Sequence, residues 1–144
     1  MLKPYTIGML EHTAKNNPAV VAHAEIKNGA VFTIADGKTV LPTATTAKGK
    51  DLWVAINTMN GDDYGTDAKI PAGAYVNAYQ LAAWEGQYLE MDGVEAAIGD
   101  TLVVNTKGAF EKATATDGYA LVFKVEAVTV LNGGKALRVR IVAL

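Results

Sequence analysis

Short runs of apolar residues, many of them alternating with polar ones, follow one another along the chain from residue 19 onward. The runs at residues 20–26, 30–35 and 51–58 are rich in branched residues, and a repeat of two residues is typical of strands with one buried face. The dipeptides Asn28-Gly29 and Asp36-Gly37 lie between the first runs and accept the positive φ angles of tight hairpin turns. The pattern predicts an all-β fold.

Two stretches of the chain share one plan. Residues 26–46 and 98–116 each contain a turn, an apolar run, a second turn with glycine, and a threonine-rich segment that we expect to be a strand end. Aligning Gly37 with Gly108 also aligns Thr43-Ala44-Thr45 with Thr114-Ala115-Thr116. A repeat array needs about three or more units, so we expect one domain in which two related hairpin units fold onto one core.

The chain ends in two long alternating runs, residues 120–131 and 136–144, on either side of Asn132-Gly133-Gly134-Lys135. This arrangement predicts a hairpin with well-specified register. Unbroken alternation places the members of the first run on two faces: Leu121, Phe123, Val125, Ala127 and Thr129 on one, and Val122, Lys124, Glu126, Val128 and Val130 on the other.

Residues 1–17 have no sustained period and include an Asn16-Asn17-Pro18 turn signal at their end. We interpret them as an N-terminal extended arm ahead of a single β domain at residues 18–144. The arm is either a disordered leader or a segment that orders on a partner. Its apolar residues Tyr5, Ile7, Met9 and Leu10 are candidate contacts, because the alternation of the first three suits strand addition to a sheet edge.

Composition narrows the possible partners. The 144 residues fit one domain with a proper core. Lys and Arg number 13 against 15 Asp and Glu, so no basic surface for nucleic acid or an anionic membrane is expected. No run approaches the roughly 20 apolar residues of a membrane span. Cysteine is absent, which removes disulfides and thiolate metal ligands.

Residues 59–72 are irregular, with three acidic residues, two glycines and a proline. They predict a loop. It is either a surface loop with solvated carboxylates or a calcium loop built from Asp62, Asp63 and Asp67, although the ligand spacing of known calcium loops is missing.

Residues 73–89 hold four aromatic side chains, Tyr75, Tyr79, Trp84 and Tyr88. Tyr75 and Tyr79 fall on one predicted strand face with Asn77, and Trp84 lies in the bend that follows. Tyr75, Tyr79 and Trp84 are either ordinary packing residues or surface and interface aromatics that stack a sugar or another ligand. The segment has no Lys or Arg to accompany single-stranded nucleic acid.

Catalytic patterns are missing from the sequence. His12 and His23 are the only histidines, serine and cysteine do not occur, and no phosphate-binding glycine motif is present. We therefore expect neither an enzyme nor a cofactor or metal site.

The run Ile26-Lys27-Asn28-Gly29-Ala30-Val31-Phe32, the turn at Gly37, Val40-Leu41-Pro42 and then Asp51-Leu52-Trp53-Val54-Ala55 resemble the capsid decoration (cement) proteins of tailed bacteriophages. Ile98-Gly99-Asp100-Thr101-Leu102-Val103 looks like a second instance of the same opening. The resemblance covers about residues 26–116. The chain is longer than the smallest members, and residues 59–72 have no counterpart in the pattern.

The resemblance implies a compact β-barrel or β-tulip-like domain. It also implies a structural virion protein on the outer surface of the mature phage head, made in the host cytoplasm. It further implies a homo-oligomer, a trimer, that binds the major capsid protein lattice and stabilises the head, with the N-terminal arm contacting the shell. A carbohydrate- or ligand-binding β-module that uses Tyr75, Tyr79 and Trp84 is one alternative. A phage tail or baseplate component is another.

Overall fold

The computed structural model describes residues 2–5, 16–57, 69–131 and 133–144. The expected all-β fold is confirmed: the regular elements are strands and two short 3-10 helices. The strands are β1 Leu2–Tyr5, β2 Asn16–Val21, β3 Ile26–Lys27, β4 Val31–Ala35, β5 Lys38–Val40, β6 Trp53–Ala55, β7 Lys69–Ile70, β8 Tyr75–Gln80, β9 Tyr88–Asp92, β10 Thr101–Val104, β11 Phe110–Lys112, β12 Leu121–Leu131 and β13 Gly134–Ala143. The 3-10 helices are η1 Thr46–Lys48 and η2 Leu81–Trp84.

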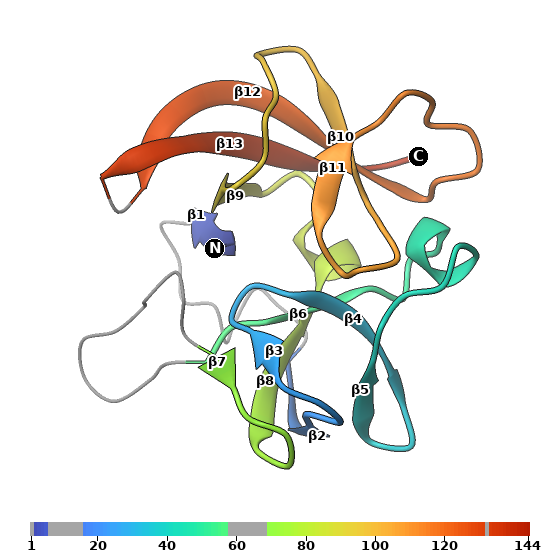
Figure 1. Cartoon of the computed structure of the whole chain (residues 1–144). Helices are drawn as coiled ribbons and strands as arrows, with labels where there is room; N and C mark the ends of the chain where they lie inside the picture. Colours follow the sequence, from blue (N-terminus) through green and yellow to red (C-terminus); the bar gives the residue numbers. More distant parts are fainter. Residues whose placement is uncertain (1, 6–15, 58–68, 132) are drawn as a thin grey trace.

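The strands form a closed barrel and a larger curled sheet. The barrel has the order β2-β5-β4-β6-β8, and the six-stranded sheet has the order β1-β9-β13-β12-β10-β11. Strands β3 and β7 pair separately. In Figure 1 the barrel occupies the lower half of the molecule and the sheet arches over it, with the long β12–β13 hairpin extending to the left.

Alternation along the barrel strands divides their side chains between two cores. In β4, Val31 belongs to a cluster shared with the six-stranded sheet, whereas Phe32 belongs to a cluster inside the barrel. Val54 and Ala55 divide in the same way in β6. Because successive side chains of a strand point to opposite faces, these strands are buried on both sides, and the outer face of the barrel is packed against the sheet.

The interior of the barrel is filled by small and branched residues together with one aromatic ring. A closed barrel of five strands leaves little room inside, which explains the alanines. The buried members of this cluster are Val20, Ala22, Phe32, Ala55, Ile70, Val76 and Ala78.

The two hairpin units are present, one in each sheet. The β4–β5 hairpin turns at Asp36 and Gly37, both with positive φ, and the β10–β11 hairpin turns through Gly108. Their threonine-rich segments were expected to be strand ends, and this expectation was wrong. Thr43 and Thr46 exchange backbone-to-hydroxyl hydrogen bonds of 2.7 and 3.1 Å ahead of η1, so these hydroxyls bind local backbone instead of continuing a ladder.

Three predicted boundaries differ from the structure. The predicted Asn16-Asn17-Pro18 turn is the start of β2, which pairs with β8. The strand expected at residues 20–26 ends at Val21 and resumes at β3. Two residues of the predicted loop 59–72 form β7, because Ile70 fills the barrel core and pairs with Ile26.

The β12–β13 hairpin is present, but the predicted alternation is wrong beyond Glu126. Val125 pairs with Val139 and Ala127 with Arg138, so Glu126 is the extra residue of a β-bulge. A bulge places two successive residues opposite one and shifts the following side chains to the other face. Val128 therefore lies on the face of its cross-strand neighbour Leu137, a core residue.

Candidate functional site

A concavity lies where the barrel meets the six-stranded sheet. We call it the junction groove. Its volume is about 690 Å³. The barrel side contributes residues 25–30 and Leu41, and the sheet side contributes residues 91–94 and 107–110. Turns from both hairpin units thus form its walls.

Backbone hydrogen bonds fix the two walls relative to each other. The Val31 N–H donates to Gly108 O at 2.9 Å, which joins the first strand of one hairpin unit to the turn of the other. On the barrel side the Gly29 N–H donates to Ala55 O at 2.7 Å, and the buried Asn28 side chain bonds the backbone of Asn57 at 2.8 and 3.1 Å. The groove is a preformed feature of the fold.

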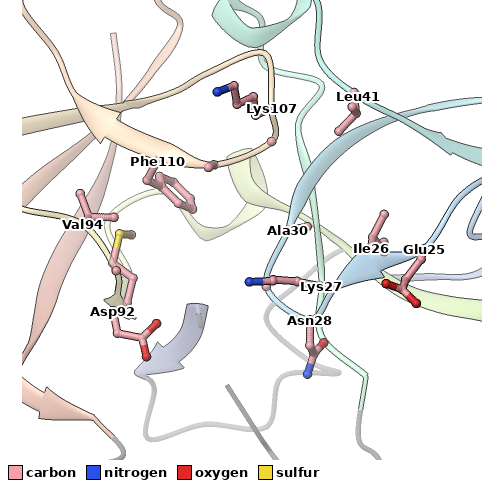
Figure 2. A pocket seen from close by; sticks show the side chains of 15 residues that line it. Glu25, Ile26, Lys27, Asn28, Ala30, Leu41, Asp92, Val94, Lys107 and Phe110 are labelled. Atoms are coloured by element: carbon pink, nitrogen blue, oxygen red, sulfur yellow. The ribbon is translucent and has the colours of Figure 1, made fainter. Parts of the chain in front are cut away.

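The side chains of the groove combine apolar surface with charge. Figure 2 shows Phe110 and Val94 on the sheet side, and Lys27 and Asp92 reaching into the space from opposite walls. Phe110 is held edge-on against the core residue Phe123, with ring centroids 4.8 Å apart. An arrangement of this kind suits binding of a partly apolar, charged group.

Ion pairs lie on the face of the six-stranded sheet that points away from the shared core. Arg138 bonds the nearly buried Glu90 at 2.9 Å, and Arg140 bonds Glu126 at 2.6 Å. The hydrogen bond from Arg140 lowers the pKa of the Glu126 carboxyl. Paired in this way, the groups form a polar outer surface for the sheet.

The predicted aromatic surface is not formed by its three residues. Tyr75 is 71% exposed, whereas Tyr79 and Trp84 are 8% and 1% exposed and belong to the shared core. The rings of Tyr79 and Trp84 stack on each other, with centroids 5.6 Å apart. Tyr75 and Tyr79 occupy opposite ends of β8, and of these two only Tyr79 belongs to the core shared with the six-stranded sheet. Tyr79 and Trp84 are therefore packing residues, and the alternative that placed them on the surface was wrong; Tyr75 does lie on the surface.

The candidate arm residues are only partly within the described chain. Tyr5 is the last residue of β1, which pairs with β9 in the register Tyr5–Tyr88. The first described residues of the chain thus extend one edge of its own six-stranded sheet. Ile7, Met9 and Leu10 lie outside the described residues, and their contact with a shell stays a prediction.

Aliphatic side chains are exposed on the distal half of the β12–β13 hairpin. Val128 is 47% and Val130 is 72% exposed, and the bulge at Glu126 turns both toward the face of Leu137 and Lys135. Ile98, 66% exposed, precedes Gly99, whose N–H donates to Val125 O beside the bulge. We call Val128 and Val130 the hairpin strip.

The calcium hypothesis for Asp62, Asp63 and Asp67 concerns residues outside the described part of the chain. Within the described ranges, no group of three His, Cys, Asp or Glu residues is placed to hold a metal ion. No helix of the described residues is long and apolar enough to cross a membrane. His23 is exposed on the loop after β2.

The residues of the junction groove were not identified from the sequence. Lys27, Asp92 and Lys107 each stand one or two positions before a glycine with positive φ, at Gly29, Gly93 and Gly108. The glycines of these turns were the feature of the sequence that could have pointed to the groove residues. Which turns meet in space depends on the pairing of distant strands, and the sequence pattern does not specify it.

Comparison with known proteins adds no relative: no protein-family model, curated protein or solved structure matches the chain. The class that the fold itself defines is an all-β protein that combines a closed five-stranded barrel with a curled six-stranded sheet.

Proposed function

We propose that the protein is a structural, non-catalytic virion protein: a capsid decoration protein that binds the outer surface of a mature tailed-phage head and stabilises it. The observation that supports this most is the hairpin strip. β-Branched side chains left exposed together on an ordered hairpin favour contact with another protein surface. The resemblance of residues 26–116 to decoration proteins points to the same function, and the proposed partner is the major capsid protein lattice.

The proposed mechanism is physical. A protein that binds the mature lattice, and not its dissociated or unfolded subunits, adds its binding free energy to the stability of the head. The strip is far smaller than the roughly 800 Å² per partner of a typical stable interface, so each contact is weak. Attachment as a homo-oligomer, with a trimer as the expected form, multiplies weak contacts through effective concentration.

The test is cosedimentation with mature heads of the encoding phage that lack the protein. We expect the wild-type protein to pellet with heads and to raise their temperature of disruption. The Val128→Lys and Val130→Lys double variant should remain in the supernatant, because a charged group cannot be desolvated without a matching charge. Val40→Lys is the matched control, since Val40 is exposed on the barrel strand β5.

Failure of the wild-type protein to bind heads would overturn the proposal. Immunogold labelling of intact virions distinguishes the related alternative: label on the tail instead of the head identifies a tail or baseplate component. The described ends of the N-terminal segment belong to β1 and β2, so the arm is better tested by substituting Ile7 and Met9 than by removing residues 1–17.

A further inference from the structure

Two lysines, Lys27 and Lys107, and two carboxylates, Glu25 and Asp92, line the junction groove. Lys27 lies directly opposite Lys69 in the β3–β7 pair, and like charges opposite each other on paired strands are unfavourable. Glu25 pairs with Lys69 at 3.4 Å. The ammonium groups of Lys27 and Lys107 have no hydrogen bond or ion pair with any residue in the described ranges.

Both carboxylates of the groove already have interactions with other groups. Glu25 is engaged by Lys69, and Asp92 likewise has an interaction of its own. Lys27 on the barrel side and Lys107 on the sheet side are therefore the charged lining residues that have no described partner. Two such ammonium groups suit the carboxylates of a ligand.

A free strand edge begins at the same place. Strand β11 is at the end of the sheet order. The bonds from Asn105 N–H to Ala109 O and from Ala113 N–H to Thr101 O fix which residues of β11 face β10. By the alternation of antiparallel ladders, the backbone groups of Phe110 and Lys112 point away from β10, and no described residue bonds them.

Apolar surface completes the groove. Phe110 and Val94 are partly exposed on the sheet side, and Leu41 is 58% exposed on the barrel side. A volume of about 690 Å³ is too large for a single anion and lies in the range of sites that hold several side chains.

We propose that the junction groove docks an extended peptide segment of another protein, in which aliphatic residues alternate with Asp or Glu. The backbone of the segment pairs with Phe110 and Lys112 on the free edge of β11, as in strand addition. Its carboxylates pair with Lys27 and Lys107, and its aliphatic side chains cover Phe110 and Val94. This site is separate from the hairpin strip and does not depend on the proposed attachment to a capsid.

The test is fluorescence anisotropy with a labelled six-residue peptide of alternating Glu and Leu, titrated with the full-length protein to about 1 mM. We expect saturable binding. An alternating Lys and Leu peptide should bind at least tenfold more weakly, and an all-Glu peptide should also bind more weakly, because it offers no apolar side chain to the groove.

Charge-reversal variants locate the site. Lys27→Glu combined with Lys107→Glu should weaken binding of the Glu–Leu peptide about tenfold, since two exposed ion pairs are lost and become repulsive. The matched control is Lys38→Glu with Lys50→Glu, a pair of exposed lysines that do not line the groove. All four sites are on the surface, and circular dichroism verifies that each variant is folded.

Three outcomes would overturn the proposal: no saturable binding of the Glu–Leu peptide, equal weakening by the groove and control variants, or an all-Glu peptide that binds as tightly as the alternating one. None of these outcomes bears on cosedimentation with heads. Conversely, failure to bind heads leaves the peptide measurement intact, so the two proposals fail separately.

Discussion

Gly37 and Gly108 have almost the same backbone conformation, with φ of +70° and +71°, but different surroundings. A Cβ atom at Gly37 would meet nothing within 4 Å. A Cβ atom at Gly108 would overlap the carbonyl oxygen of Val31, the residue whose N–H donates to Gly108 O. Gly37 is required only by the conformation of its turn, whereas Gly108 also permits the two hairpin units to make backbone contact.

This difference predicts unequal effects of alanine. Gly37→Ala should lower the free energy of unfolding by roughly 1–2 kcal/mol, the cost of a left-handed backbone for a residue with Cβ. Gly108→Ala should cost roughly 1–3 kcal/mol more, because a backbone oxygen cannot move aside cheaply. Urea denaturation of both variants measures the difference, and equal losses would show that the Gly108 contact contributes nothing.

At this scale the sequence predicted the role of both glycines in turns, because a positive φ is a local requirement. It did not predict the contact of Gly108 with Val31. That contact depends on where a distant strand lies, and so do the burial of Tyr79 and Trp84 and the exposure of Tyr75. A tyrosine row has the same local pattern whether or not another sheet covers it.

Among the elements, β6 and β8 are linked by a side chain that acts as part of the ladder. Strand β6 ends at Ala55, and Asn57 then bonds β8 through its amide: Nδ2 donates to Tyr75 O at 2.9 Å, and Oδ1 accepts from Asn77 N–H at 2.7 Å. The Asn28 side chain bonds the Asn57 backbone from the other side. Two amide side chains thus complete this end of the barrel.

Asn57→Ala should therefore destabilise the protein by about 1–3 kcal/mol, since it leaves backbone groups of β8 without partners. Asn57→Asp is the graded control, because it keeps the acceptor for Asn77 N–H and loses the donor to Tyr75 O. Urea midpoints should fall in the order wild type, Asn57→Asp, Asn57→Ala. The reverse order of the two variants would contradict this account.

The sequence predicted the elements best where alternation was uninterrupted. Leu52, Val54 and Ile56 face one core, and Trp53 and Ala55 face the other, which is the repeat of two residues expected of the strand at residues 51–58. The bulge at Glu126 was not predicted from the sequence. Val128 and Val130 are two residues apart, and this spacing fits a strand whichever face the two side chains lie on. Only pairing with β13 shows that the register shifts there.

Across the whole molecule, one apolar cluster contains residues of both sheets. Leu52 and Val54 from the barrel side and Phe123 and Ile141 from the six-stranded sheet belong to it. The prediction of two hairpin units on one core is correct for this cluster. The second cluster, inside the barrel, was not predicted, because closure of a barrel depends on pairing between distant strands. A shared core of this kind favours a single cooperative unfolding transition.

The two tryptophans test this cooperativity. Trp53 packs against the barrel cluster, and Trp84 lies in the shared cluster. The Trp84 Nε1 atom is buried with no hydrogen-bond partner among the described residues, so Trp84→Phe removes no such bond. Variants Trp53→Phe and Trp84→Phe should each show one urea midpoint by fluorescence and by far-ultraviolet circular dichroism. Separate midpoints in either variant would mean that the barrel unfolds independently.

The parallel pairing of β2 with β5, which closes the barrel, affects where the barrel opens. Strands β2 and β5 share one registered pair, Val21 with Lys38, supported by bonds from Val21 N–H to Gly37 O and from His23 N–H to Thr39 Oγ1. Local opening occurs where the fewest interactions must break. The barrel therefore has a preferred line of opening, at which backbone amide hydrogens exchange with solvent before those of β4, while the sheet above remains closed.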